Sequence, residues 1–353
     1  MAKLEKLRKA LVEQNIDALL VTSEFNRRYI TGFTGTAGVA IVSQNDAVFI
    51  TDFRYTEQAK KQVEGFRIVQ HEKLIVDEVA TQVEQMGIKS LGFEKDTVTY
   101  SAFENYKTKI KADLIPVSGL IEKIRLIKTN EEINIIKVAC EIADNAFTHI
   151  LNVIKPGITE LEVSNELEFF MRKQGATSSS FDTIVASGLR SALPHGVATN
   201  KVIEKGDFVT LDFGAYYNGY VSDITRTIAV GNPSQQLVDM YNAVLESQLL
   251  ALEKVGPNMT GIEADAVARD YLKSKGLGEA FGHSTGHGIG LEVHEGPGLS
   301  FRSDTVLEPN MVVTIEPGVY LPGIGGVRIE DDILITETGN EVLTHSKKEL
   351  IIL

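Results

Sequence analysis

The sequence predicts two domains, an α/β domain over residues 1–125 and an α+β domain over residues 126–353. Short apolar runs alternate with helical stretches through the first part of the chain, which is typical of an α/β domain. A strong helix-start signal follows that alternation. Beyond it, a helix followed by strand-rich sequence occurs twice, so we expect the second domain to consist of two pseudo-symmetric halves.

The composition is that of an ordinary globular protein, with 353 residues, 43% of them hydrophobic, and a net charge of −13. Basic residues are nowhere clustered, so we expect no nucleic-acid partner. The single cysteine, Cys140, excludes an intrachain disulfide and favours a reducing, cytoplasmic setting. It lies in an apolar helical run, which predicts a packed thiol. We also expect no signal peptide and no membrane partner, because no apolar run is long enough.

Apolar spacing predicts the elements of the first domain. Helices are expected at residues 3–14, 54–63, 74–86 and 101–110, and strands at 17–22, 38–43, 47–52, 66–70, 90–94 and 113–118. The segments NRRYITGFTGTAG and TDFRYTEQA are expected to form loops. Arg27, Arg28 and Arg54 in them are candidates for a homodimer interface or for reaching a neighbour's cleft. The alternative is that these segments are turns with surface salt bridges.

The second domain begins with a capping box, Thr129-x-x-Glu132, that predicts a long helix to about Val153. Residues 156–175 and 257–276 then match at an offset of 101. Each copy has a Pro-led turn, a Thr-x-x-Glu box, an amphipathic helix and a terminal glycine. The usual residue preferences at helix ends explain part of this match, but the equal lengths of the two copies favour duplication. A site shared by the two halves would lie at their seam.

A two-residue turn at Asn218-Gly219 predicts a β-hairpin in the first half. Its register places Asp212 opposite Thr225 and puts Asp212 and Asp223 on one face of the sheet. Their Cα atoms are then roughly 7–8 Å apart, close enough to share a metal cluster. Thr225 is expected to hold Asp212 through a hydrogen bond.

The second half supplies further candidates within apolar runs. Glu316 ends MVVTIE, and Glu330 lies in VRIEDDILI, where alternation places Arg328 on the same face. His287 lies between two glycines, which let the backbone approach a metal or ligand. The H-x-x-x-H pair that ends at His287 lacks both the glutamate and the helical pattern of a zincin. GHGIG likewise lacks the strand-turn-helix context of a dinucleotide loop.

Four carboxylates and one imidazole in apolar settings call for divalent metal. Without cysteine among them, they suit Mn²⁺, Co²⁺, Fe²⁺ or Zn²⁺. Four carboxylates exceed what one catalytic zinc uses and suit two ions about 3.5–4 Å apart. Two dications would also neutralise negative charge that is costly in an apolar interior.

The motifs LDFGA, SDITRT, GHGIG, IEPGVY and GGVRIEDD, in this order, resemble those of the pita-bread metallopeptidases. This family includes aminopeptidase P, prolidase, methionine aminopeptidase and the metal-free creatinase. The first domain resembles the creatinase/prolidase N-terminal domain, so the likeness spans nearly the whole chain. It implies a pita-bread fold for residues 126–353, and all five ligand positions of the metal-dependent branch are filled.

The resemblance implies a role for each of these residues. Asp212 would bind one metal only, Asp223 and Glu330 would bridge both metals, and His287 and Glu316 would bind the other. Mn²⁺ is favoured, with Co²⁺ or Zn²⁺ as alternatives. Glu316 would also act as general base.

Four further residues match substrate-side positions of the family. His294 would contact the substrate, and His195 and His283 would stabilise developing oxyanion charge. Arg328 would orient a carboxylate or gate the cleft.

The implied activity is that of a metallo-exopeptidase that cleaves before a proline in the second position. Two subtypes remain open. Some prolidases resemble HExPR after the histidine equivalent to His294, whereas this chain reads HEGPG, with Gly298 in place of the arginine. That difference favours an aminopeptidase P, which accepts longer peptides, over a prolidase restricted to dipeptides. A non-catalytic binding module is a third reading, and a metal-dependent esterase or phosphatase a fourth. Family members are commonly homodimers.

Overall fold

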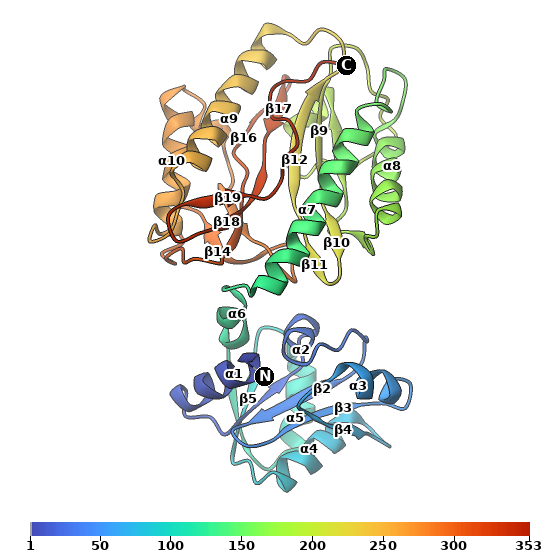
Figure 1. The fold of residues 1–353 in the computed structure, drawn as a ribbon, viewed down its shortest axis with the longest axis vertical. Helices are drawn as coiled ribbons and strands as arrows, with labels where there is room; N and C mark the ends of the chain where they lie inside the picture. Colours follow the sequence, from blue (N-terminus) through green and yellow to red (C-terminus); the bar gives the residue numbers. More distant parts are fainter. Residues whose placement is uncertain (1) are drawn as a thin grey trace. The chain divides into compact units, whose positions relative to one another are not determined.

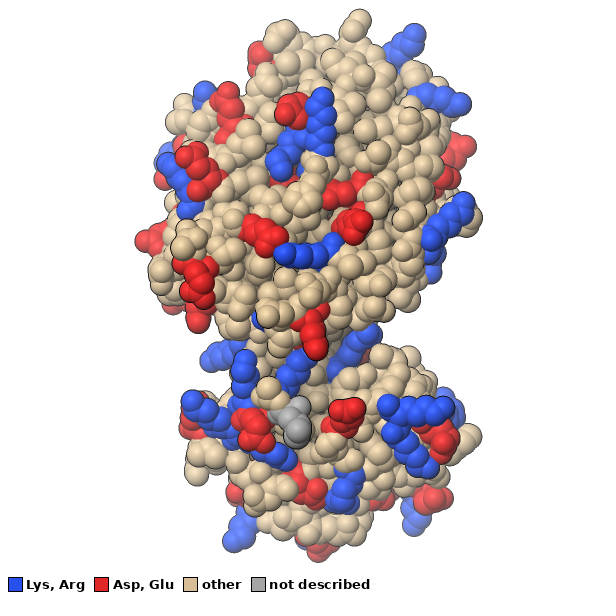
Figure 2. All heavy atoms as spheres, viewed as in Figure 1, with Lys and Arg blue, Asp and Glu red and all other residues tan. Residues whose placement is uncertain are grey.

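A computed structural model describes residues 2–353 of the chain. The chain divides into two compact units, Met1–Arg125 and Leu126–Leu353. Figure 2 shows Lys and Arg side chains scattered among Asp and Glu over the visible face, without a continuous basic surface. Within residues 2–353, no helix is both long and apolar enough to cross a membrane.

The first unit is built on a six-stranded sheet in the order β4-β3-β2-β1-β5-β6. Its strands are β1 (Ala18–Val21), β2 (Val39–Ser43), β3 (Ala47–Thr51), β4 (Arg67–Gln70), β5 (Ser90–Glu94) and β6 (Asp113–Val117). Its helices are α1 (Ala2–Glu13), α2 (Glu24–Thr31), α3 (Thr56–Gln62), α4 (Ile75–Gln85), α5 (Tyr100–Lys109) and α6 (Leu120–Arg125). The pairs β1–β2 and β2–β3 are antiparallel and the others parallel. Every predicted element of this unit is present, but α2 and α6 were not predicted.

Helix α2 corrects the prediction that NRRYIT lies in a loop. The Ser23 side chain caps the helix by accepting from the Asn26 N–H, and Gly32, with φ of 74°, ends it. Arg27 is only 5% exposed, and its guanidinium donates to the carbonyls of Gly35 and Gly38 at 2.9 Å. Arg27 therefore holds the following loop in place through its guanidinium, which is not free at the surface.

The helices of the second unit begin at the predicted capping boxes. Helix α7 (Asn130–Ile150) starts at Thr129 and ends slightly before the expected position. Helices α8 (Glu160–Lys173) and α10 (Gly261–Ser274) each have 14 residues and a complete Thr-x-x-Glu box, which confirms the repeated pattern. The long helix α9 (Gln235–Lys254) precedes the second copy. Figure 1 shows the helix pairs α7–α8 and α9–α10 flanking the strands of this unit.

Two groups of strands lie between the helix pairs. The first half contains β7 (Ser178–Ser179), β8 (Ile184–Ser187), β9 (Phe208–Phe213), β10 (Ala215–Tyr217), β11 (Tyr220–Val221) and β12 (Ile224–Ala229). The second half contains β13 (Gly286–Gly288), β14 (Glu295–Leu299), β15 (Val312–Ile315), β16 (Gly318–Leu321), β17 (Gly325–Arg328), β18 (Asp331–Ile335) and β19 (Asn340–Val342). Their sheets run β12-β9-β8, β11-β10-β7, β14-β13-β15-β18-β19 and β16-β17.

The predicted hairpin register is confirmed. Tyr217 pairs with Tyr220, and Asp212 pairs with Thr225. Asn218 and Gly219 have φ of 47° and 91°, as a primed two-residue turn requires. The register therefore delivers Asp212 and Asp223 to the same region of the fold.

Cys140 of α7 is fully buried, as predicted for a packed thiol. Its Sγ donates to the Asp332 carboxylate at 3.3 Å, and the same carboxylate oxygen accepts from the Asp223 N–H at 2.8 Å. Burial raises the pKa of this thiol well above its ordinary value. The thiol therefore serves as a packing and hydrogen-bonding group beneath the segment that carries Asp223.

Candidate metal centre

The candidate ligands come from both halves of the second unit. Asp212 lies on β9, and Asp223 lies between β11 and β12. His287 lies on β13, Glu316 follows β15, and Glu330 lies between β17 and β18. A hydrogen bond joins the two halves where these segments meet. In it, the Glu330 N–H donates to the Thr225 carbonyl at 3.0 Å. The seam between the two halves therefore contains the candidate site.

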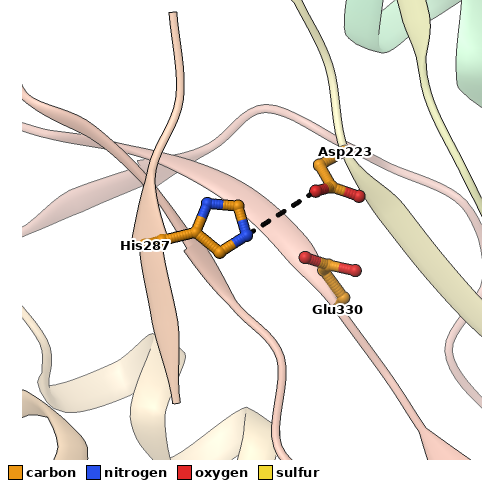
Figure 3. Close-up of side chains that lie close together, drawn as sticks. All are labelled: Asp223, His287 and Glu330. Carbon is orange, nitrogen blue, oxygen red and sulfur yellow. Dashed lines mark ion pairs between the residues drawn. The ribbon is translucent and has the colours of Figure 1, made fainter. Parts of the chain in front are cut away.

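Asp223, His287 and Glu330 form a close cluster, with one ligand atom of each within 4.8 Å of the others. Figure 3 shows the three side chains pointing toward one another from different segments. His287 Nε2 lies 3.8 Å from Asp223 Oδ2 and 3.4 Å from Glu316 Oε1. Three of the predicted ligands, Asp223, Glu316 and Glu330, thus lie close to the His287 ring.

Asp212, the fifth, lines the same cleft and is paired with Arg328. One carboxylate oxygen of Asp212 accepts from Arg328 Nη2, and the other is buried without a hydrogen-bond partner among the described residues. Arg328 also donates to the Tyr320 hydroxyl at 2.6 Å and to Thr225 Oγ1 at 3.2 Å. With a further hydrogen bond to the Pro194 carbonyl at 3.3 Å, these contacts fix Arg328 beside Asp212.

Thr225 corrects a sequence-based prediction. It lies opposite Asp212 as expected, but its hydroxyl donates to Glu330 Oε2 at 2.6 Å. The predicted hydrogen bond from Thr225 to Asp212 was wrong. The Asp212 carboxylate is paired with Arg328 instead, and Glu330 reaches the Thr225 hydroxyl from the other half of the unit. Thr225 therefore supports a different carboxylate of the same site.

Burial and mutual repulsion shift the pKa values of the acidic groups upward. Burial, followed by the charges of Glu330 and Asp212, raises the pKa of Asp223 well above its usual range. Burial and the charge of Glu316 do the same for Glu330, and burial raises the pKa of Glu316. Burial also lowers the pKa of His287, which favours the neutral imidazole that binds metal.

The site opens into a cleft of about 520 Å³. All nine residues predicted for the site line it: Asp212, Asp223, Glu316, Glu330, His195, His283, His287, His294 and Arg328. His195 and His294 are exposed at the cleft surface. The rings of His287 and His294 lie 4.3 Å apart between centroids. The structure therefore brings every predicted site residue into one cavity.

Phe181, Asp182 and Tyr320 are among the lining or supporting residues that were missed from the sequence. Phe181 and Asp182 line the cleft just before β8, whose Ile184 pairs with Asp212. Tyr320 connects Arg328 to His283, whose Nε2 lies 2.9 Å from the hydroxyl. The hairpin β16–β17 places Tyr320 there, and its GVY and GGVR segments are the one sequence signal that pointed to it.

The donor set fits divalent metal ions. Buried oxygens of Asp212 and Asp223 have no hydrogen-bond partner in the described part of the chain. Such orphaned oxygens are costly unless a cation or proton satisfies them. Oxygen donors with one neutral imidazole match the preference of borderline divalent ions. The residues present therefore fit a metal centre on their own chemistry.

Comparisons with known proteins agree with the fold. Residues 134–337 match metallopeptidase family M24, and residues 3–127 match the creatinase/prolidase N-terminal domain. The chain belongs to this family of pita-bread metallopeptidases. The predicted fold class and the prediction of a metallo-exopeptidase are thereby confirmed.

Particular relatives cover the chain almost completely. A solved Xaa-Pro dipeptidase from Bacillus anthracis is 67% identical, with a TM-score of 0.99 and coverage of 100% of this chain and 99% of that chain. The Xaa-Pro dipeptidase of Pyrococcus furiosus is 43% identical, with 99% of both chains covered. A solved X-Pro aminopeptidase from Thermotoga maritima is 41% identical, with a TM-score of 0.91 and coverage of 98% and 100%.

Proposed function

We propose that the protein hydrolyses the bond between an N-terminal residue and a following proline, with Xaa-Pro dipeptides as its main substrates. The observation that carries this proposal is the buried cluster of Asp223, His287 and Glu330 inside the cleft. Relatives at 67% and 43% identity are named Xaa-Pro dipeptidases, which favours the dipeptidase subtype. Gly298 favoured the aminopeptidase subtype in the sequence, and the Thermotoga relative keeps it as the second candidate.

The five ligand candidates would hold two divalent ions, with Mn²⁺ the favoured metal. Those candidates are Asp212, Asp223, His287, Glu316 and Glu330. When bound, such ions would supply polarisation of the scissile carbonyl and a water of lowered pKa, which can act as a nucleophile at neutral pH. Glu316 has a raised pKa, which suits a group that takes a proton from water and returns it to the leaving nitrogen.

The remaining polar residues would bind the substrate and orient the site. His195 and His294 are exposed in the cleft and would contact the substrate and its developing oxyanion. His283 Nδ1 lies 2.8 Å from the Ser284 carbonyl, so that nitrogen carries the proton and Nε2 accepts from Tyr320. We therefore assign His283 to holding Tyr320 and Arg328, and Arg328 to orienting the Asp212 carboxylate.

The proposal also includes a cytoplasmic location and a homodimeric assembly. A single cysteine suits a reducing cytoplasm. A homodimer is expected, and light scattering of the purified protein would test it. Residues 126–353 supply every candidate catalytic residue, so we assign catalysis to this domain and leave residues 1–125 without a chemical step.

The test is hydrolysis by metal-stripped protein after addition of Mn²⁺, Co²⁺ or Zn²⁺. Xaa-Pro dipeptides, Xaa-Pro-Yaa tripeptides and Xaa-Ala dipeptides should be compared, with Glu316→Gln as the inactive control. We expect faster cleavage of Xaa-Pro dipeptides than of Xaa-Pro-Yaa tripeptides or Xaa-Ala dipeptides. Equal or faster cleavage of the tripeptides would establish the aminopeptidase subtype. No cleavage of any Xaa-Pro bond by the metal-loaded protein would reject the proposed function.

A further inference from the structure

A buried ion pair lies next in the chain to the cleft-lining residue His294. Lys128 Nζ donates to Glu295 Oε1 at 2.8 Å, and the two side chains are only 2% and 8% exposed. Lys128 is itself fixed, because its N–H donates to the Asn310 carbonyl and the next residue, Thr129, caps α7. Glu295 begins β14 and directly follows His294. The pair therefore ties a rigid helix start to the residue beside a substrate-side histidine.

The Glu295 carboxylate also contacts the loop that follows His287. A Cβ on Gly290 would lie 2.4 Å from Glu295 Oε1, so only glycine lets the carboxylate approach this closely. Glu295 and Gly288 are paired residues of β14 and β13. The Gly290 carbonyl accepts from the Val221 N–H at 3.0 Å, close to Asp223. Glu295 thus lies where the segments carrying His287, His294 and Asp223 meet.

His294 has no polar anchor of its own. Across residues 2–353, its ring makes no hydrogen bond, and its ring contact is with His287. His283, in contrast, has partners on both ring nitrogens. The position of the His294 ring therefore depends on its backbone, and that backbone leads directly into the anchored Glu295.

We propose that Lys128 is a positioning residue for the peptidase reaction, holding Glu295 and through it the His294 ring at the cleft. A buried ion pair is weak evidence for stability, because an apolar pair of similar volume often serves as well. What the charged pair adds is a fixed, directional contact. The inference rests on the proposed function in so far as His294 contacts the substrate.

The decisive comparison is Lys128→Met in the wild-type and in the His294→Ala background. If Lys128 acts through His294, Lys128→Met should lower kcat/KM by about 10- to 100-fold in the wild type, the usual effect of losing a supporting contact. In the His294→Ala background it should change kcat/KM by less than about 2-fold, because coupled sites are not additive. Lys137→Met is the matched control, since Lys137 of α7 makes an exposed ion pair with Glu341 of β19.

An equal loss in both backgrounds, or no loss in the wild type, would overturn the proposal. If Lys128→Met is recovered unfolded, Glu295→Gln keeps the side-chain shape, and the same comparison of backgrounds decides. A crystal structure of Lys128→Met gives a readout without activity: the His294 ring should move by more than about 0.5 Å while His287 stays in place. An unmoved ring would refute positioning, even for a protein that cleaves no Xaa-Pro bond.

Discussion

Tyr320 connects the Arg328 guanidinium to the neutral imidazole of His283 in the cleft. Its hydroxyl accepts from Arg328 at 2.6 Å and lies 2.9 Å from His283 Nε2, and burial raises its pKa to about 12. Removing the hydroxyl takes away the shorter of the two hydrogen bonds of Arg328 Nη1, whose other acceptor is the Pro194 carbonyl at 3.3 Å, at a cost of roughly 1–3 kcal/mol. Because the hydroxyl also fixes Arg328 beside Asp212, this loss reaches a predicted metal ligand.

We therefore expect Tyr320→Phe to lower kcat/KM for Xaa-Pro substrates by about 10-fold or more, an amount that corresponds to 1.4 kcal/mol. Tyr100→Phe is the control, since Tyr100 is exposed in the first unit. Steady-state kinetics with matched metal content measures the effect. Unchanged kinetics for Tyr320→Phe would show that the hydroxyl bridge has no catalytic consequence.

Asp17 offers a pH-dependent prediction in the first unit. The N–H groups of Ser90 and Lys89 donate to its carboxylate and lower its pKa below the ordinary value of 3.8. A lowered folded-state pKa stabilises the protein above 3.8, and that stability is lost as pH falls through the folded value. Asp17→Asn should therefore destabilise the folded state near neutral pH by under about 1 kcal/mol, since the group is exposed.

The difference between Asp17→Asn and wild type should disappear at low pH. Urea unfolding at several pH values measures it, with Asp113→Asn, an exposed residue of the neighbouring strand, as the control. A difference that grows on acidification would contradict the assignment of these hydrogen bonds.

Single residues also show where sequence reasoning stopped. Metal-ligand candidates were found because a carboxylate inside an apolar run is unusual, and the structure gathers all of them in one cleft. The partner of Thr225 could not be found, because Glu330 lies 105 positions away and reaches it only across the seam. From the sequence, Arg27 is expected at the surface, because arginine is rarely buried. In the structure its side chain donates to backbone carbonyls of the following loop, which local sequence does not indicate.

At the scale of elements, local signals predicted most of the fold. Capping boxes and the Asn-Gly turn act within a few residues, so α7, α8, α10 and the hairpin followed from sequence alone. Helix α2 was missed because its buried side includes the polar residues Asn26 and Arg27, so its sequence lacks a regular apolar face. Sheet order and the break between β17 and β18 depend on long-range pairing, which local patterns do not contain.

Strand β13 is the element that the candidate site depends on most. It lies between β14 and β15, and a Cβ on Gly286 would meet the Thr314 carbonyl at 1.9 Å. Gly286→Ala should therefore displace β13 and His287, lower kcat/KM and manganese affinity by at least about 10-fold, and destabilise the fold by more than about 1 kcal/mol. Calorimetric titration with Mn²⁺ and thermal melting measure both effects.

Gly282→Ala is the control for that strand. No atom lies within 4 Å of a Cβ placed on Gly282, although it belongs to the same glycine-rich segment. It should retain metal affinity and activity. If Gly286→Ala binds Mn²⁺ as tightly as Gly282→Ala, then β13 does not determine the position of the metal centre.

For the whole molecule, the two halves of the second unit share one acidic site, so metal removal should act on both. Without cations, burial and mutual repulsion both disfavour the charged carboxylates, as their raised pKa values reflect. Bound metal stabilises a folded state by about 2.7 kcal/mol when its concentration is 100 times Kd. Chelation should therefore lower the melting temperature and accelerate hydrogen exchange in β12, β13 and β18.

Hydrogen exchange of the six-stranded sheet in the first unit is the internal control. Because the candidate ligands all lie beyond residue 126, exchange in β1–β6 should change little on chelation. Mass spectrometry of peptides from both units measures the contrast. Acceleration confined to the first unit, or none anywhere, would argue against a structural role for metal at the seam.

The buried thiol on α7 makes the protein convenient for labelling experiments, because it is protected in the folded state. Cys140 is the chain's single cysteine, and it lies under the carboxylate that also holds the Asp223 N–H. A thiol-reactive dye should leave the native protein unmarked and report, by the rate of its attachment, how often α7 separates from β18. Fluorophores can also be attached to cysteines introduced elsewhere on the surface without first replacing the native one.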